Sequence, residues 1–212
     1  MHSNSSAFTG DLLSEHYSTV LVCPKLHLYA STLTGHVVRH TEFGDIERLT
    51  EGWPCDAVVH RLQMFNHILY ACTSQGLFLY RSGSWQATSI TSPCYQVRER
   101  GGFGYAATSN GLWAGSLEYW EQYALPDLTV YDFLSLPHYV VVAHERGMSF
   151  YDRYTDAWAD IYKECAVTSL AAFHNHLIGA NDRGQLIIGN KRGGLDAYRF
   201  DCLFITGVTI SQ

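Results

Sequence analysis

The chain has 212 residues, of which 16% are charged and 14% are aromatic, and its formal net charge is −6. Few charges with many aromatic residues are typical of packed sheets and exclude an intrinsically disordered chain. The acidic balance, without a cluster of Lys and Arg, argues against a nucleic-acid partner. The N-terminus lacks the pattern of a signal peptide, and no window of about 18 apolar residues predicts a membrane span. We therefore expect a cytosolic protein whose six cysteines are reduced.

A unit of about 37 residues occurs five times along the chain. Each copy has an apolar, β-rich run, a short polar turn that is closed by glycine, and a second run. The turn glycines are Gly35, Gly76, Gly111, Gly147 and Gly184. A unit of this size cannot bury a core alone, so a regular series of such units indicates stacked sheets.

The second copy shows the expected strands most clearly. Its four predicted strands cover Asp56–Met64, His67–Thr73, Leu77–Arg81 and Trp85–Ile90. Five such antiparallel sheets in series predict an all-β, five-bladed β-propeller, with a β-solenoid as the alternative. We expect one domain over residues 1–212, in which residues 1–16 are an N-terminal extension.

A large aromatic residue recurs where each fourth strand is expected to begin. The five positions are Trp53, Trp85, Trp120, Trp158 and Phe200. Rings at a fixed phase of the repeat are what packing between neighbouring sheets requires, so we expect them in the core.

Two segments resemble the short blades of known propellers. HILYACTSQGLFLYRSGSWQ and GYAATSNGLWAGSLEYWEQY are similar to blades of the two-component-regulator and sialidase-repeat type. The blade count and small size also resemble the five-bladed tachylectin lectins. The resemblance implies the propeller fold for nearly the whole chain, and it does not imply one function.

The first strand of the first blade has two candidates. Leu203–Ser211 repeats the phase of a first strand and would close the ring from the C-terminal end, which is the arrangement that we favour. Tyr17–Val22 precedes the first copy and fits the same place. The surplus strand would add an edge, plug the ring or pair with a second copy of the chain, so a homo-oligomer is one prediction.

Two repeat positions carry residues that bind metals in other proteins. Histidine is expected to begin four of the second strands, at His27, His67, His138 and His176. Cysteine precedes four of the first strands, at Cys55, Cys94, Cys165 and Cys202. The alternatives are polar hairpin residues for the histidines and small packing residues for the cysteines, and we expect no metal and no cofactor.

The turns between second and third strands are the predicted ligand-binding positions. They should share a face with the loops that enter each first strand, where propellers most often bind. The predicted contacts are the turn residues Gln75, Asn110, Arg146 and Arg183 with the aromatic residues Trp53, Tyr95 and Trp113. Such a mixture suits a glycan or another small polar ligand, although local turn chemistry accounts for the polar residues as well.

The first strands carry the residues of the enzyme hypothesis. Asp132 and Glu99 would form a pair of carboxylates, with His60 as a third acid-base group. Glycine-rich phosphate loops and the usual hydrolase and zinc motifs are absent from the sequence. We therefore expect a non-catalytic binding module or assembly subunit that presents a propeller face to a protein or small polar ligand. A lectin-like protein is the second hypothesis, and a small hydrolase or lyase is the third.

Overall fold

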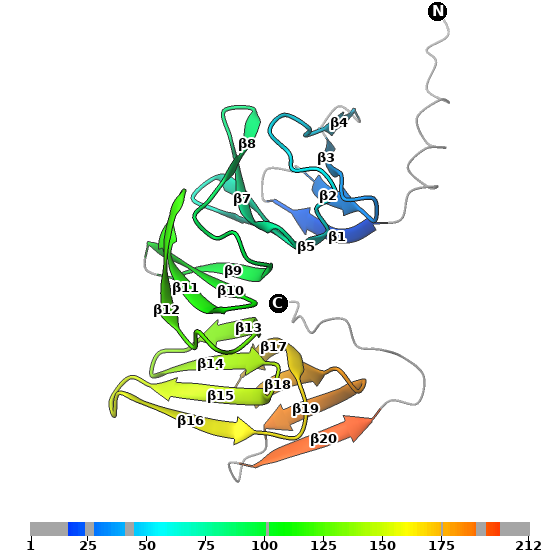
Figure 1. Cartoon of the computed structure of the whole chain (residues 1–212). Helices are drawn as coiled ribbons and strands as arrows, with labels where there is room; N and C mark the ends of the chain where they lie inside the picture. The colour runs from blue at the N-terminus through cyan, green and yellow to red at the C-terminus, as the bar shows by residue number, and fades with distance from the viewer. Residues whose placement is uncertain are drawn as a thin grey trace, which may run out of the picture. The chain divides into compact units, whose positions relative to one another are not determined.

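The computed structural model describes residues 17–23, 28–40, 45–100, 102–174, 176–189 and 194–199. These residues form twenty β-strands, β1 to β20, in five sheets of four strands each. The strands of each sheet follow one another in chain order, so each sheet is an antiparallel meander (Figure 1). The prediction of five four-stranded antiparallel sheets is confirmed. The described part of the chain contains no helix that could span a membrane.

The sheets fall into two compact units. The first unit contains the first two sheets, together with Leu117–Tyr119. Its first sheet consists of β1 (Tyr17–Val22), β2 (Leu28–Thr32), β3 (Val37–His40) and β4 (Ile46–Arg48). Its second sheet consists of β5 (Val59–Phe65), β6 (Ile68–Thr73), β7 (Gly76–Arg81) and β8 (Ser84–Ala87).

The second unit contains the other three sheets. The third sheet consists of β9 (Cys94–Arg100), β10 (Phe103–Thr108), β11 (Gly111–Ser116) and β12 (Tyr119–Ala124). The fourth consists of β13 (Val130–Ser135), β14 (Tyr139–His144), β15 (Gly147–Asp152) and β16 (Ala157–Tyr162). The fifth consists of β17 (Val167–Phe173), β18 (His176–Asn181), β19 (Gln185–Gly189) and β20 (Leu195–Arg199).

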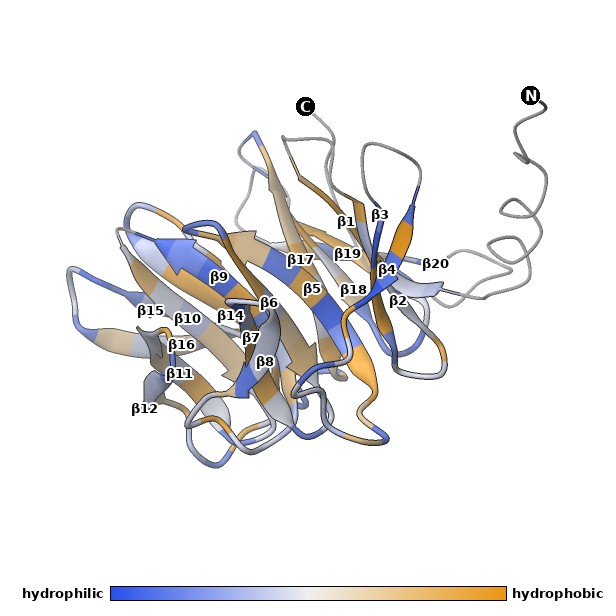
Figure 2. Cartoon of the chain, turned by 90° about the horizontal axis from the view of Figure 1, so that it is seen from above, coloured by the Kyte–Doolittle hydropathy of each residue, from blue (hydrophilic) through white to orange (hydrophobic). Residues whose placement is uncertain are grey.

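Every first strand contains a β-bulge near its start. The pairing with the second strand skips one residue in each sheet, at Ser18, His60, Tyr95, Tyr131 and Thr168. Figure 2 shows hydrophobic and hydrophilic residues following one another along β5 and β9. A bulge re-aims the side chains that follow it. In the second unit the residues after the bulge, Gln96, Asp132 and Ser169, are polar and fully buried.

A buried polar residue ends every second strand. These residues are Thr32, Thr73, Thr108, His144 and Asn181. Each accepts a hydrogen bond from a backbone N–H of the turn that follows, at 3.1–3.2 Å. The side chain therefore closes the turn, and the glycine at its end has a positive φ in all five sheets. The glycines and the polar character of these turns were predicted from the sequence, whereas the burial of this polar residue was not.

The recurring aromatic residues do not all have the predicted place. Trp85 and Trp120 are the second residues of their strands and are buried, as expected. Trp158 has the same place in β16 but is 37% exposed. Trp53 lies beyond β4, because that strand ends at Arg48, and it packs instead on Trp85 with ring centroids 4.6 Å apart. Phe200 lies outside the described residues.

The first sheet begins with the N-terminal candidate strand. Tyr17–Val22 pairs with β2 as the first strand of this sheet, so the sheet has four strands without a C-terminal contribution. The position that the sequence analysis assigned to Leu203–Ser211 is therefore taken by β1. Leu203–Ser211 lies outside the described residues, and so do residues 1–16.

Candidate binding pocket

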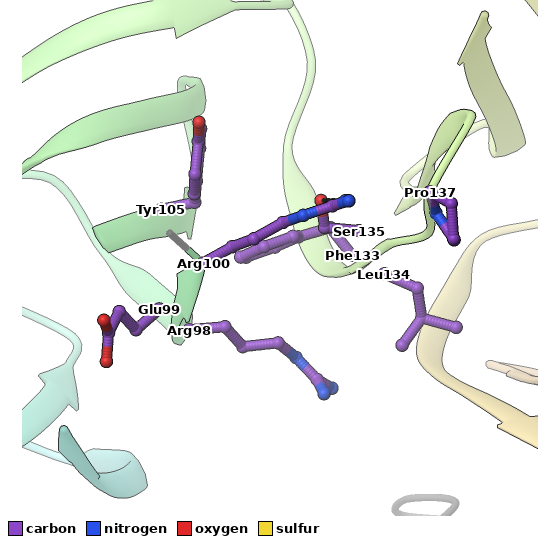
Figure 3. A pocket seen from close by; sticks show the side chains of 8 residues that line it. All are labelled: Arg98, Glu99, Arg100, Tyr105, Phe133, Leu134, Ser135 and Pro137. Carbon is purple, nitrogen blue, oxygen red and sulfur yellow. Dashed lines mark hydrogen bonds between the residues drawn. The ribbon is translucent and has the colours of Figure 1, made fainter. Parts of the chain in front are cut away.

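The C-terminal half of β9 carries two arginines, Arg98 and Arg100. Alternate residues of a strand point to the same side, so both side chains share one side and Glu99 has the other. Figure 3 shows this arrangement: both arginines extend to one side of β9, with Arg100 directed toward Ser135, whereas Glu99 extends to the other side. The alternation of the strand thus places two guanidinium groups on the same side of the exposed end of β9.

The two arginines border a pocket of about 360 Å³ in the second unit. Its lining residues come from β9, β10, β13 and the connection that follows β13: Arg98, Glu99, Arg100, Tyr105, Phe133, Leu134, Ser135 and Pro137. One wall is polar and carries the guanidinium groups and a hydroxyl (Figure 3). The other wall is made of rings and aliphatic side chains. We call this site the arginine pocket.

A third arginine joins the polar wall. Arg100 Nη1 donates to Ser135 Oγ and to the Leu136 carbonyl, the latter at 2.6 Å. Arg153, in the turn that follows β15, donates from Nη2 to the same Ser135 Oγ at 3.0 Å. Two guanidinium groups therefore converge on one hydroxyl oxygen, which is neutral and leaves their charges uncompensated.

The charges of these arginines are balanced unequally. Arg98 Nη2 donates to Asp132 Oδ1 at 3.0 Å, so its charge is paired. Its Nε is buried and has no hydrogen-bond partner among the described residues. Within the same described part of the chain, neither Arg100 nor Arg153 makes an ion pair with a carboxylate. Arg100 and Arg153 are therefore two cations without a carboxylate partner in the described part of an acidic chain.

Asp132, the carboxylate of the enzyme hypothesis, accepts hydrogen bonds from other groups of the protein on both of its oxygens. It is fully buried, and its Oδ1 accepts hydrogen bonds from Gln96 Nε2 at 3.2 Å, from Arg98 Nη2 and from the Phe133 N–H at 2.8 Å. Its Oδ2 accepts from the Leu170 N–H of β17 at 2.9 Å. One carboxylate thus ties the first strands of three successive sheets together. These contacts favour a structural role over an acid-base role.

The other two residues of the enzyme hypothesis lie elsewhere. Glu99 is exposed at the edge of the arginine pocket. His60 is the exposed bulge residue of β5, in the first unit. Within the second unit, then, Asp132 is joined to Gln96, Arg98 and Leu170 rather than to a second carboxylate.

The predicted shared face of turns and entry loops is present within individual sheets. A turn N–H donates to the carbonyl just before the first strand from Ser74 to Val58, from Glu145 to Thr129 and from Asp182 to Ala166. The predicted contact residues on these turns behave differently. Gln75 donates to the Cys55 carbonyl at 2.7 Å, and Asn110 Oδ1 accepts from Thr108 and Trp113, whereas Arg146 and Arg183 are exposed.

The predicted aromatic contacts of this face are partly occupied by the protein itself. Trp53 donates from Nε1 to the Gly35 carbonyl at 2.9 Å, and Trp113 donates to Asn110 at 3.2 Å. Tyr95 packs edge-on against Tyr131, with ring centroids 5.1 Å apart. Burial, followed by the neighbouring Tyr131, raises the pKa of Tyr95. Among the predicted contact residues of the second unit, Asn110 and Trp113 lie in contact, whereas Tyr95 contacts Tyr131, which was not among them.

The repeated histidines have different local structures. His67 and His138 lie in the turns before β6 and β14, so they do not begin strands as predicted. In the second sheet the reason is that β5 extends to Phe65, so the two-residue turn is shifted by one residue and contains His67, which has a φ of 60°. His176 does begin β18, and its Nδ1 lies 2.8 Å from the Gly189 carbonyl. His27 lies outside the described residues, which contain no group of three His, Cys, Asp or Glu side chains suited to a metal ion.

The repeated cysteines share a phase but not an environment. Cys94 is buried at the start of β9, Cys55 is exposed, and Cys165 is half-buried and accepts a hydrogen bond from Asn181 Nδ2. All the cysteines in the described ranges are free thiols. Cys202 lies outside these ranges.

A His–Ser–Asp chain in the fourth sheet resembles a catalytic arrangement only in composition. The Arg146 N–H donates to His144 Nδ1 at 3.1 Å, so the ring proton is on Nε2, which donates to Ser149 Oγ at 2.8 Å. Ser149 in turn donates to Asp160 Oδ1 at 2.5 Å. A histidine that activates serine must accept its proton, and here the direction is reversed. Lys163, and then Ser149, hold the pKa of Asp160 below its ordinary value.

The hydrogen bonds of His144 predict that the stability of the protein depends on pH. Burial, as the main cause, lowers the pKa of His144 from 6.5, so the unfolded chain binds the proton more readily than the folded one. The stabilisation is therefore complete above pH 6.5 and is lost as the pH falls below it, with a slope of up to about 1.4 kcal/mol per pH unit. Urea unfolding at several pH values between 7.5 and 5.5 measures the free energy of unfolding. This free energy should fall less steeply with falling pH for His144→Gln than for the parent. Equal slopes would contradict the assignment.

Comparison with known proteins identifies the fold. No protein-family model matches the chain, and no curated protein matches it either. Among solved structures, the chain is similar to the WD40 β-propeller domain of Doa1, with a TM-score of 0.70 and 11% identity over 91% of this chain and 71% of that one. The chain has a β-propeller fold.

Two other solved structures resemble this propeller. The extracellular domain of a one component system from B. thetaiotaomicron has a TM-score of 0.71 and 18% identity, and 88% of this chain covers 28% of that domain. Virginiamycin B lyase from Staphylococcus aureus has a TM-score of 0.69 and 10% identity over 88% of this chain and 70% of the lyase. These proteins differ widely in kind. The similarity therefore establishes the fold, and the function has to be argued from the residues of the site.

Proposed function

We propose that this propeller is a non-catalytic binding module that holds an anionic group of a protein or small polar ligand in the arginine pocket. The observation that carries the proposal is the convergence of Arg100 and Arg153 on Ser135 Oγ without a carboxylate partner among the described residues. Guanidinium groups on a pocket wall recognise carboxylates and phosphates through paired, charge-assisted hydrogen bonds. Cytosolic localisation, with reduced thiols, is part of the same proposal.

Two further observations support binding rather than catalysis. The buried carboxylate of Asp132 is held by four hydrogen bonds within the protein. The serine of the His144 chain donates its proton toward Asp160 and so is not activated as a nucleophile. Asp132 and the His144–Ser149–Asp160 series therefore both serve to connect strands within the protein.

Replacement of Arg100 tests the proposal. Titration of ¹⁵N-labelled protein with sodium acetate and with sodium phosphate, at constant ionic strength, should give saturable shifts of resonances around the arginine pocket for at least one anion. Arg100→Gln should weaken this binding at least tenfold, as expected for loss of about 1.5–3 kcal/mol from a charged hydrogen bond.

A matched variant provides the control. Arg199 is an exposed arginine at the end of β20, so Arg199→Gln removes the same charge from another place and should leave the affinity unchanged. Equal binding by the parent and Arg100→Gln, or the absence of saturable shifts with either anion, would disprove the proposal.

A further inference from the structure

The arginine pocket has two walls of different chemistry. We call its polar lining residues, Arg98, Arg100 and Ser135, the polar wall, and its apolar lining residues, Tyr105, Phe133, Leu134 and Pro137, the apolar wall. We infer that the pocket takes a carboxylate carried on an apolar body, an inference that rests on the proposed function. Such a group occurs in a free aliphatic or aromatic acid and at a protein C-terminus that ends in an apolar residue.

The polar wall provides a fixed guanidinium fork. Arg100 Nη1 is anchored by Ser135 Oγ and the Leu136 carbonyl, and the second acceptor is a backbone atom. A guanidinium carries five N–H donors, so this anchoring fixes its plane and leaves other donors of the fork for a ligand. A planar, preorganised fork matches the two oxygens of a carboxylate.

The charge around the pocket favours one negative charge over two. The positive charge of Arg98 is already paired with Asp132, so Arg100 and Arg153 supply the uncompensated charge. Glu99 lies at the pocket edge and repels anions. A phosphate dianion is also more strongly hydrated than a carboxylate, and it has no apolar part to place against the second wall.

The apolar wall favours a ligand that has an apolar part next to its carboxylate. Phe133 is buried and Tyr105 is half-buried, with their rings 6.4 Å apart, so the base of this wall is fixed by packing. A bare anion leaves the exposed parts of Tyr105, Leu134 and Pro137 in contact with water, whereas an apolar body covers them. Each methylene that is removed from water contributes about 0.8 kcal/mol, which corresponds to about a fourfold gain in affinity.

A homologous series of acids tests the inference. The probes are acetate, propionate, butyrate, 3-phenylpropionate and inorganic phosphate, titrated into the ¹⁵N-labelled protein at constant ionic strength. The dissociation constant should fall about fourfold per added methylene from acetate to butyrate, and phosphate should bind more weakly than butyrate. Leu134→Ala should flatten the dependence on chain length, while Arg100→Gln should weaken every acid and Arg199→Gln none.

The source of the carboxylate is distinguished by a second pair of probes. N-acetyl-Ala-Ala-Leu with a free C-terminus should bind more tightly than its C-terminal amide if a protein end is the natural ligand. Binding of the free acids without binding of the peptide identifies a small molecule instead, and both results agree with the inferred chemistry.

Two outcomes overturn the inference in different ways. An affinity that does not depend on chain length, or phosphate binding as tightly as butyrate, would contradict the amphipathic ligand but would keep an anion-binding module. The absence of Arg100-dependent binding for every probe would remove the proposed function as well.

Discussion

Asp132→Ala should lower the free energy of unfolding by about 3–5 kcal/mol, the range for breaking a buried, hydrogen-bonded charge network. The substitution removes the carboxylate that accepts hydrogen bonds from Gln96 Nε2 and Arg98 Nη2, and it leaves the Leu170 N–H without its carboxylate partner. Each buried donor without an acceptor costs about 1–3 kcal/mol. Because the carboxylate connects β9, β13 and β17, the loss should affect three sheets of the second unit at once.

Urea unfolding of the parent and the variant measures this effect, and Glu99→Ala is the matched control. Glu99 is an exposed carboxylate on β9, so its removal should change the free energy of unfolding by no more than about 0.5 kcal/mol. If Asp132 were instead an acid-base catalyst without a structural role, its replacement would leave stability unchanged. A change of less than about 1 kcal/mol for Asp132→Ala would contradict the structural assignment.

Gly147→Ala should lower the free energy of unfolding by about 3–5 kcal/mol, because two costs combine at this position. Gly147 has a φ of 135°, a region that residues with a side chain rarely adopt. A Cβ on this residue would lie only 1.9 Å from the Tyr162 carbonyl oxygen, which is backbone and cannot rotate away. The end of β16 would have to move from the start of β15.

Gly102→Ala separates the two costs. Gly102 also has a positive φ, of 87°, but a Cβ there has nothing within 4 Å. This control should therefore cost only the conformational strain, about 1–2 kcal/mol. Thermal and urea unfolding of both variants measure the difference, and equal destabilisation would show that the close approach of Gly147 to Tyr162 does not contribute.

Much of the fold was predictable from local patterns. The β-rich runs and the turn glycines predicted strands that pair with their neighbours in the chain, and the structure confirms them. The predicted burial of Trp85 and Trp120 is confirmed as well. Trp53 was misassigned, because the short β4 ends at Arg48 and leaves a loop that the repeat phase does not reveal. Such a local departure from the repeat depends on packing rather than on periodicity.

The candidate site was less accessible to prediction. The alternation of Arg98 and Arg100 was visible in the sequence, but these arginines carried no expectation of a pocket. Ser135 ends β13 and Arg153 lies in the turn after β15, and only folding brings them together beside Arg100 of β9. The bulge before Asp132 likewise turns an apparent acid-base residue inward.

The sequence by itself determined the number of sheets, their meander topology and the positions of their turns, because these follow from contacts between neighbouring segments of the chain. Only the tertiary structure decided which polar residues are hydrogen-bonded within the protein and which can bind a ligand. Asp132 and His144 are occupied within the protein, whereas Arg100 and Arg153 face one hydroxyl without a carboxylate among the described residues. That distinction depends on side chains from separate sheets, whose register no local pattern specifies.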